Sequence, residues 1–151
     1  MNVSGDHTSV PWDAIDTVLM DMDGTLLDLN YDNQIFAHRL PAAFAKHHGL
    51  TLEAASQQLG DHMAKVGGTM DFYRLNYWRD LTGLDILALH EQAANLICFL
   101  PGAAEFLRTL SERSKRTLIV TNADRQSFAI KDRVLRLSPR VNQVISSHDL
   151  G

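Results

Sequence analysis

The chain has 151 residues, of which 45% are hydrophobic, which is enough for one globular domain that carries a small insertion. Its formal net charge of −4 argues against a nucleic-acid partner. No apolar run is long enough to span a bilayer, and residues 1–16 lack the apolar core of a secretory signal, so we expect a cytoplasmic protein with no membrane partner. The single cysteine, Cys98, excludes an intrachain disulfide, and we expect it to be a small buried hydrophobe.

The first predicted element is a short strand at residues 17–20, whose sequence is Thr-Val-Leu-Met. A short apolar run of this kind is typical of a strand that is buried on both faces of a parallel sheet. Asp21 ends the run, and Gly24 then breaks the chain direction.

Residues 33–98 have a different character, because alanine, leucine and glutamine dominate and runs of β-branched residues are missing. The pattern predicts four helices. The first starts at Asp32 or Asn33 and is either kinked or restarted at Pro41, the second starts at Thr51, the third covers about 71–81, and the fourth covers about 86–99.

Alternating helices and strands return after Pro101-Gly102. Apolar residues at helical spacing predict a helix from residue 103 to about 110. A second buried strand, 117–120, ends at Thr121-Asn122, where another helix is expected to begin, and a third strand covers 144–146. The order predicts an α/β fold with a Rossmann-like, three-layer parallel sheet, in which residues 1–29 and 100–151 form the core and residues 30–99 form an inserted all-helical cap.

The acidic residues after the first strand are the strongest candidates for chemistry. In extended backbone, Asp21 and Asp23 point to the same side, so both carboxylates are expected to face one pocket. Two neighbouring carboxylates repel each other unless a cation or a raised pKa stabilises them. Mg²⁺ suits such a site because it binds oxygen ligands and keeps water and substrate phosphate in its shell. Because ligands of open α/β sheets lie at the carboxyl ends of the strands, Thr121 and Asn122 are expected to line the same crevice.

Two carboxylates, a Mg²⁺ site and polar groups in one crevice together predict attack on a phosphate ester. A metal ion neutralises the charge of the phosphate, one carboxylate attacks the phosphorus, and a second carboxyl group protonates the leaving oxygen. The Thr121 hydroxyl and the Asn122 N–H, placed at the start of a helix, are expected to bind the phosphate.

The run from Asp21 to Asp28, Asp-Met-Asp-Gly-Thr-Leu-Leu-Asp, resembles the first motif of the haloacid dehalogenase superfamily, and 118–122 resembles its second motif. The helical insertion resembles the α-helical cap of that superfamily. The resemblance implies that Asp21 is the nucleophile and a metal ligand, that Asp23 is the general acid/base and binds metal through its backbone carbonyl, and that Thr121 and Asn122 hold the phosphate.

The chain departs from the family pattern at its end. The family's third motif supplies a lysine and its fourth supplies acidic metal ligands, and both normally follow a segment like 147–151. We therefore expect a C-terminally truncated form with little or no activity and with the first strand at an exposed sheet edge. Lys131 lies on a predicted helix beside Asp132 and Arg133, and we expect it to be a solvated charge rather than a substitute for the missing lysine.

Within the superfamily, the likeness is closest to bacterial GMP/IMP nucleotidases. It rests on the segments Trp12-Asp13, Asp32-Asn33, Asn76-Tyr77-Trp78, Gly83-Leu84-Asp85 and Ser146-Ser147-His148. The resemblance implies a Mg²⁺-dependent 5′-nucleotidase that acts on purine monophosphates through an aspartyl-phosphate. The alternatives are a sugar-phosphate phosphatase or phosphomutase, and an inactive fragment or module that binds a phosphorylated ligand.

Other residues favour structural roles. The aromatic residues Phe72, Tyr73, Tyr77 and Trp78 are expected to pack in a core, with stacking on a purine base as the alternative. None of the seven histidines has metal-ligand spacing, so we expect them to be surface or packing residues. Asp28 is expected to cap a helix or stabilise a turn.

Overall fold

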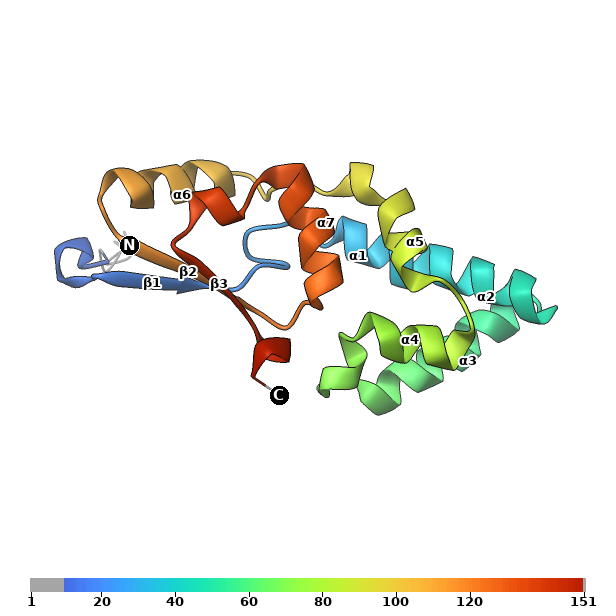
Figure 1. Ribbon diagram of the computed structural model, residues 1–151. Coiled ribbons are helices and arrows are strands. Elements are labelled where there is room, and N and C mark those ends of the chain that lie inside the picture. The colour runs from blue at the N-terminus through green and yellow to red at the C-terminus, as the bar shows by residue number, and fades with distance from the viewer. Residues whose placement is uncertain (1–9, 151) are drawn as a thin grey trace, which may run out of the picture.

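The computed structural model describes residues 10–150. A parallel sheet lies at one end of the molecule and a group of helices at the other (Figure 1). The strands β1 (Thr17–Met20), β2 (Arg116–Thr121) and β3 (Gln143–Ser146) follow the order β1-β2-β3. The predicted α/β class with a parallel, Rossmann-like sheet is confirmed, and β1 is an edge strand, as expected.

Helices α6 (Ala103–Glu112) and α7 (Arg125–Leu135) cover one face of this sheet. Successive side chains of a strand point to opposite faces of the sheet. Met20 and the neighbouring Ile119 point to the covered face, where they are buried against the apolar side of α6. The intervening residues point to the other face, where Leu19 is 65% exposed and Val120 is 42% exposed. Within residues 10–150 no helix covers this second face.

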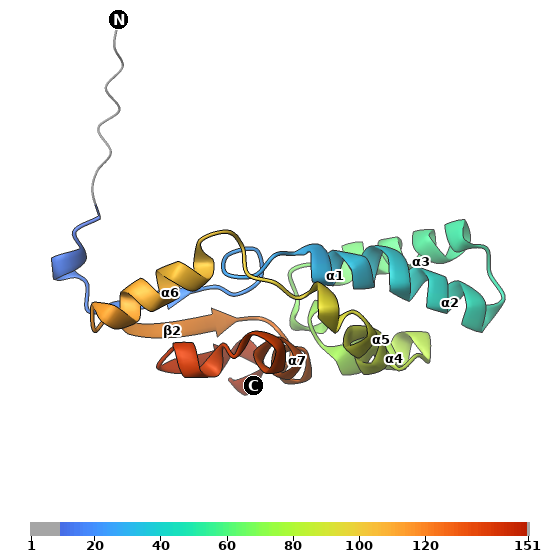
Figure 2. The same ribbon diagram turned by 90° about the horizontal axis from the view of Figure 1, so that it is seen from above.

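The helical segment begins with α1 (Asn30–Gln34), a π-helical turn η2 (Ile35–Arg39) and α2 (Leu40–His48), which run on without a break. Pro41 lacks an N–H donor, and the wider π turn directly before it relieves the conflict that a proline creates inside a helix. Helix α3 (Leu52–Val66) runs beside α2 (Figure 2) and begins directly after Thr51, close to the predicted start. The Thr51 side chain caps it by accepting a hydrogen bond from the backbone N–H of Ala54.

The remaining helices differ in length from the prediction. The third predicted helix is divided into η3 (Met70–Phe72) and α4 (Leu75–Thr82), which ends at Gly83 in the left-handed conformation. The fourth consists of α5 (Ile86–Gln92) and η4 (Ala94–Leu96) and ends before Phe99. Short 3₁₀ turns also occur outside the helical segment, at η1 (Trp12–Ala14), η5 (Ser138–Arg140) and η6 (Ser147–Asp149).

The fold also shows the environments of Cys98 and Asp28. Cys98 is exposed, so the prediction of a buried hydrophobe was wrong: the residue lies in the connection that follows η4, not inside a helix. Asp28 accepts a hydrogen bond from the backbone N–H of Asn30 at the start of α1, which confirms its structural role. No described helix is both long and apolar enough to cross a membrane.

The chain passes between the sheet and the helical segment twice, and the two passages lie side by side. Leu27 and Phe99 form an antiparallel bridge. The backbone N–H of Asp28 donates to the carbonyl of Cys98 over 3.1 Å, and that of Leu100 donates to the carbonyl of Leu26 over 2.9 Å. These hydrogen bonds hold the start and the end of the helical segment together.

Candidate active site

The loop after β1 is anchored by Met22, which is completely buried in the core under α6. The backbone N–H groups of Leu26 and Leu27 both donate to the carbonyl of Met22 over 2.9 Å, which closes a tight turn. Gly24 has φ +79°, a conformation that side chains disfavour. Because Met22 points inward, the residues on either side of it, Asp21 and Asp23, point away from the core.

The two acids have different surroundings. Asp21 is exposed, and its carboxylate has no hydrogen-bond or ion-pair partner among residues 10–150. The carboxylate of Asp23 is only 24% exposed, and its Oδ1 atom lies 2.7 Å from Nζ of Lys131. Strand register places Met20 beside Ile119, so Asp21 follows β1 close to the carboxyl end of β2.

Lys131 is 1% exposed, so the prediction that it is a solvated charge was wrong. Its ammonium group also lies 3.0 Å from Oδ2 of Asp32 on α1, and 5.2 Å from the centre of the Tyr31 ring. The residue lies on the buried side of α7, three positions after Phe128 and four before Leu135. That helical spacing was the signal in the sequence, and the neighbouring charges obscured it.

Thr121 is the last residue of β2 and Asn122 follows it, but neither residue begins a helix. Helix α7 starts at Arg125 and is capped by Asp124, so the expectation that the Asn122 N–H lies at a helix start was wrong. Thr121 is 4% exposed, and its hydroxyl accepts a hydrogen bond from the backbone N–H of Ala123. Asn122 is exposed, and its carbonyl lies 3.1 Å from Nε2 of His148.

A cavity of about 410 Å³ lies between the loop after β1, helix α7 and the helical segment. Its polar wall holds Asp23, Asp32, Asp124 and Lys131. Its apolar wall includes Leu29, Phe36, Ala37, Met63, Phe72, Tyr73 and Leu75. A cavity that is lined by charged groups and by a larger apolar surface suits a ligand that carries both an anionic group and a larger apolar part.

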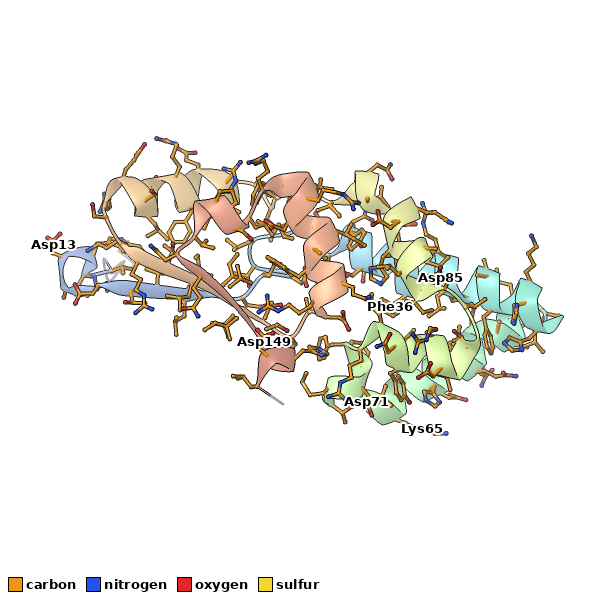
Figure 3. The ribbon with its side chains drawn as sticks, viewed as in Figure 1. Asp13, Phe36, Lys65, Asp71, Asp85 and Asp149 are labelled. Carbon is orange, nitrogen blue, oxygen red and sulfur yellow. The ribbon has the colours of Figure 1, made fainter. Side chains whose placement is uncertain are left out.

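The aromatic residues divide between the cavity and the core. Phe72 and Tyr73 line the cavity, whereas Trp78 is completely buried in the core of the helical segment. Phe36, labelled in Figure 3, also lines the cavity, and its ring stacks on that of Phe72 with centroids 6.5 Å apart. Phe36 was not among the residues singled out from sequence, because nothing distinguishes it locally from a core residue of an amphipathic helix.

His90 also lines the cavity and is 1% exposed. Its Nδ1 atom lies 2.8 Å from the Tyr31 hydroxyl, while its Nε2 atom is buried and has no hydrogen-bond partner among the described residues. Burial, together with the positive charge of Lys131, lowers the pKa of His90 from 6.5 to about 4. Burial and the negative charge of Asp32 raise the pKa of Tyr31, so both side chains are neutral at pH 7.

The acidic residues also bear on metal binding. Burial raises the pKa of Asp32, and the attraction of the Lys131 ammonium offsets only part of this effect. Residues 10–150 contain no cluster of three or more His, Cys, Asp or Glu side chains that would hold a metal. Mg²⁺ needs fewer protein ligands, because it is commonly held by one or two carboxylates together with water and substrate phosphate. The unpartnered Asp21 carboxylate fits that requirement.

The chain is similar to known phosphatases and hydrolases. Residues 15–151 match the model of the haloacid dehalogenase-like hydrolases. The chain is 31% identical over 145 residues to the GMP/IMP nucleotidase YrfG of Escherichia coli K12, and the match covers 96% of this chain. It covers 65% of YrfG, so the chain spans about two thirds of the length of this relative.

Solved structures share the same fold at lower identity. A HAD phosphatase from Thermococcus onnurineus matches with a TM-score of 0.79 and 20% identity, over 89% of this chain and 63% of the other. A putative beta-phosphoglucomutase from Thermotoga maritima matches with a TM-score of 0.56 and 16% identity, over 89% of this chain and 62% of the other. The family model covers nearly the whole chain and the fold agrees with it, so this chain belongs to the haloacid dehalogenase-like hydrolase family.

Proposed function

We propose that the chain carries the nucleophile and the leaving-group cavity of a Mg²⁺-dependent phosphomonoester hydrolase that acts on purine nucleoside monophosphates. The observation that carries this proposal is the contrast between the two acids after β1. Asp21 is exposed and unpartnered among the described residues, as a nucleophile that also binds a cation requires. Asp23 lines the cavity and its carboxylate is oriented by Lys131, so it lies where a group that exchanges protons with a leaving oxygen would be placed.

The reaction that we propose has two steps. A carboxylate oxygen of Asp21 attacks phosphorus, the bond from phosphorus to the ester oxygen breaks, and the leaving oxygen takes a proton from the Asp23 carboxyl group. In the second step Asp23 removes a proton from water, the water oxygen attacks phosphorus, and the bond from phosphorus to the Asp21 oxygen breaks, which frees inorganic phosphate and restores the Asp21 carboxylate. Thr121 and Asn122 bind the phosphate oxygens. Asp21 and the backbone carbonyl of Asp23 would hold Mg²⁺, which would supply positive charge to neutralise the phosphate.

The helical segment, residues 30–99, is the cap in this proposal, and residues 1–29 and 100–151 form the core. The cavity lies between these two parts, so a substrate with phosphate at the core has its leaving group under the cap. Closing this space excludes water, which strengthens the electrostatic interactions inside it.

The composition of the cavity supports a nucleoside as the leaving group. Its walls are mainly apolar, and Phe36, Phe72 and Tyr73 provide aromatic surface against which a flat base can pack. A sugar phosphate would need several hydrogen-bonding groups around its hydroxyls, whereas most of the surface that lines this cavity is apolar. The relative YrfG is a GMP/IMP nucleotidase, which agrees with this substrate class.

Release of inorganic phosphate tests the proposal. GMP, IMP, AMP, glucose 1-phosphate and an aryl phosphate are compared in Mg²⁺ and in EDTA. We expect turnover by this chain to be low, with the purine monophosphates as the best substrates, and we expect EDTA to abolish it. Asp21→Asn should reduce this turnover to the uncatalysed background.

The matched control is Asp16→Asn, an exposed acid just before β1, which should keep the wild-type rate. Equal turnover by wild type and Asp21→Asn would refute the assigned nucleophile. Binding of a nucleotide with no hydrolysis by the wild-type chain would favour a binding module. A preference for the sugar phosphate would refute the substrate class.

A further inference from the structure

Lys131 brings together two acids that come from different parts of the fold. Its Nζ atom lies 2.7 Å from Oδ1 of Asp23, in the loop after β1, and 3.0 Å from Oδ2 of Asp32, on the first helix of the cap. The lysine side chain is 2% exposed, while each carboxylate is 24% exposed. A buried ammonium group is strongly destabilising unless it is paired, so these contacts fix the position of the amine.

The pairing leaves the two acids after β1 unequal. Asp21 and Asp23 are two residues apart and are chemically identical, so a cation that arrives at this edge could bind either side chain. Lys131 removes this equivalence, because its ammonium group already occupies Oδ1 of Asp23 while Asp21 has no partner in the described part of the chain. Lys131 and Asp23 both line the cavity, and Asp21 is not among the residues that line it.

We propose that Lys131 is a positioning residue that keeps the Asp23 carboxylate off the Mg²⁺ ion and turned toward the leaving-group cavity. This inference rests on the proposed function. It explains how one acid serves the metal and the phosphorus while its neighbour serves the leaving oxygen. Asp32 holds the amine from the cap side, so the cap contributes to the orientation of a core residue.

A double-mutant cycle in Mg²⁺ affinity tests this role without relying on turnover. Mg²⁺ alone is titrated into the chain, and its Kd is read from the amide signal of Gly24. With Lys131 present, Asp23→Asn should change the Kd by less than about threefold, because the Asp23 side chain is not a ligand. Lys131→Met should lower the Kd about tenfold, because the released carboxylate joins the metal.

Adding Asp23→Asn to Lys131→Met should reverse that gain. Additive effects of the two changes would overturn the proposal, since they would show that Lys131 acts on the metal only through its charge. Lys115→Met, which removes a lysine whose amine donates to the carbonyl of Trp12, is the control and should leave the Kd unchanged.

Two further measurements cover a variant that does not fold. Lys131→Gln keeps a polar group in the same place and should also tighten Mg²⁺ binding. In the wild-type chain, the ammonium signal of Lys131 should be unshifted at saturating Mg²⁺; its loss or displacement would overturn the proposal. Failure of the wild-type chain to bind Mg²⁺ at all would instead refute the proposed metal-dependent function, and this inference with it.

Discussion

The buried histidine of the cavity makes the stability of the fold depend on pH. His90 is 1% exposed, and its pKa is about 4 rather than 6.5. Between these values the unfolded chain binds a proton that the folded chain does not, so the free energy of unfolding falls as pH falls through this window and levels off below about pH 4. At about 1.4 kcal/mol for each tenfold change in proton affinity, the full loss is about 3 kcal/mol.

Urea denaturation followed by circular dichroism at pH 7 and pH 4.5 measures this loss. We expect His90 to account for about 2 kcal/mol of the decrease between these two pH values. Asp32 acts in the opposite direction, because an acid whose pKa is raised on folding makes the folded state relatively more stable as pH falls. The contribution of His90 must therefore be taken as a difference between wild type and a variant.

His90→Gln provides that difference, because glutamine does not titrate and its carbonyl can accept a hydrogen bond from the Tyr31 hydroxyl. The variant should lose about 2 kcal/mol less than wild type when the pH is lowered to 4.5. His38→Gln, which changes an exposed histidine on η2, should follow wild type. An identical pH dependence in wild type and His90→Gln would refute the reasoning.

Three further predictions concern the fold, and thermal and urea unfolding measure all of them. Trp78→Ala should destabilise the cap by about 3–5 kcal/mol, because the ring is completely buried, whereas Leu81→Ala at an exposed position should cost less than about 1 kcal/mol. Gly24→Ala should be destabilising by about 1–2 kcal/mol because of its positive φ, and Gly60→Ala inside α3 should instead stabilise by about 0.5–1 kcal/mol. Asp124→Ala should cost about 1 kcal/mol through the lost cap of α7, and a null effect would show that this cap is dispensable.

The features that sequence predicts well here are local ones. A short apolar run ending in an acid predicts β1, and Thr51 predicts the start of α3, because strand periodicity and helix capping depend on neighbouring residues alone. The position of Asp21 and Asp23 in a loop after β1 could be predicted for the same reason, since that loop follows from Gly24 and the strand before it.

The residues that sequence missed depend on contacts between distant segments. Lys131 meets Asp23 and Asp32 across 108 and 99 positions of sequence. Asp124 caps α7 and also accepts a hydrogen bond from the backbone N–H of Leu75, 49 positions earlier. Charge patterns on a single helix cannot reveal such partners, which is why the sequence predicts an exposed Lys131 although this residue of α7 is buried.

The paired passages at Leu26–Asp28 and Cys98–Leu100 bear on how this architecture changes over evolution. The helical segment leaves and re-enters the sheet region through adjacent segments that are hydrogen-bonded to each other, so its two ends lie side by side. A helical segment of different size or composition could therefore replace residues 30–99 without changing β1, β2, Asp21 or Asp23. In the proposed reaction, selectivity for the leaving group would thereby be separable from the acids that act on the phosphate.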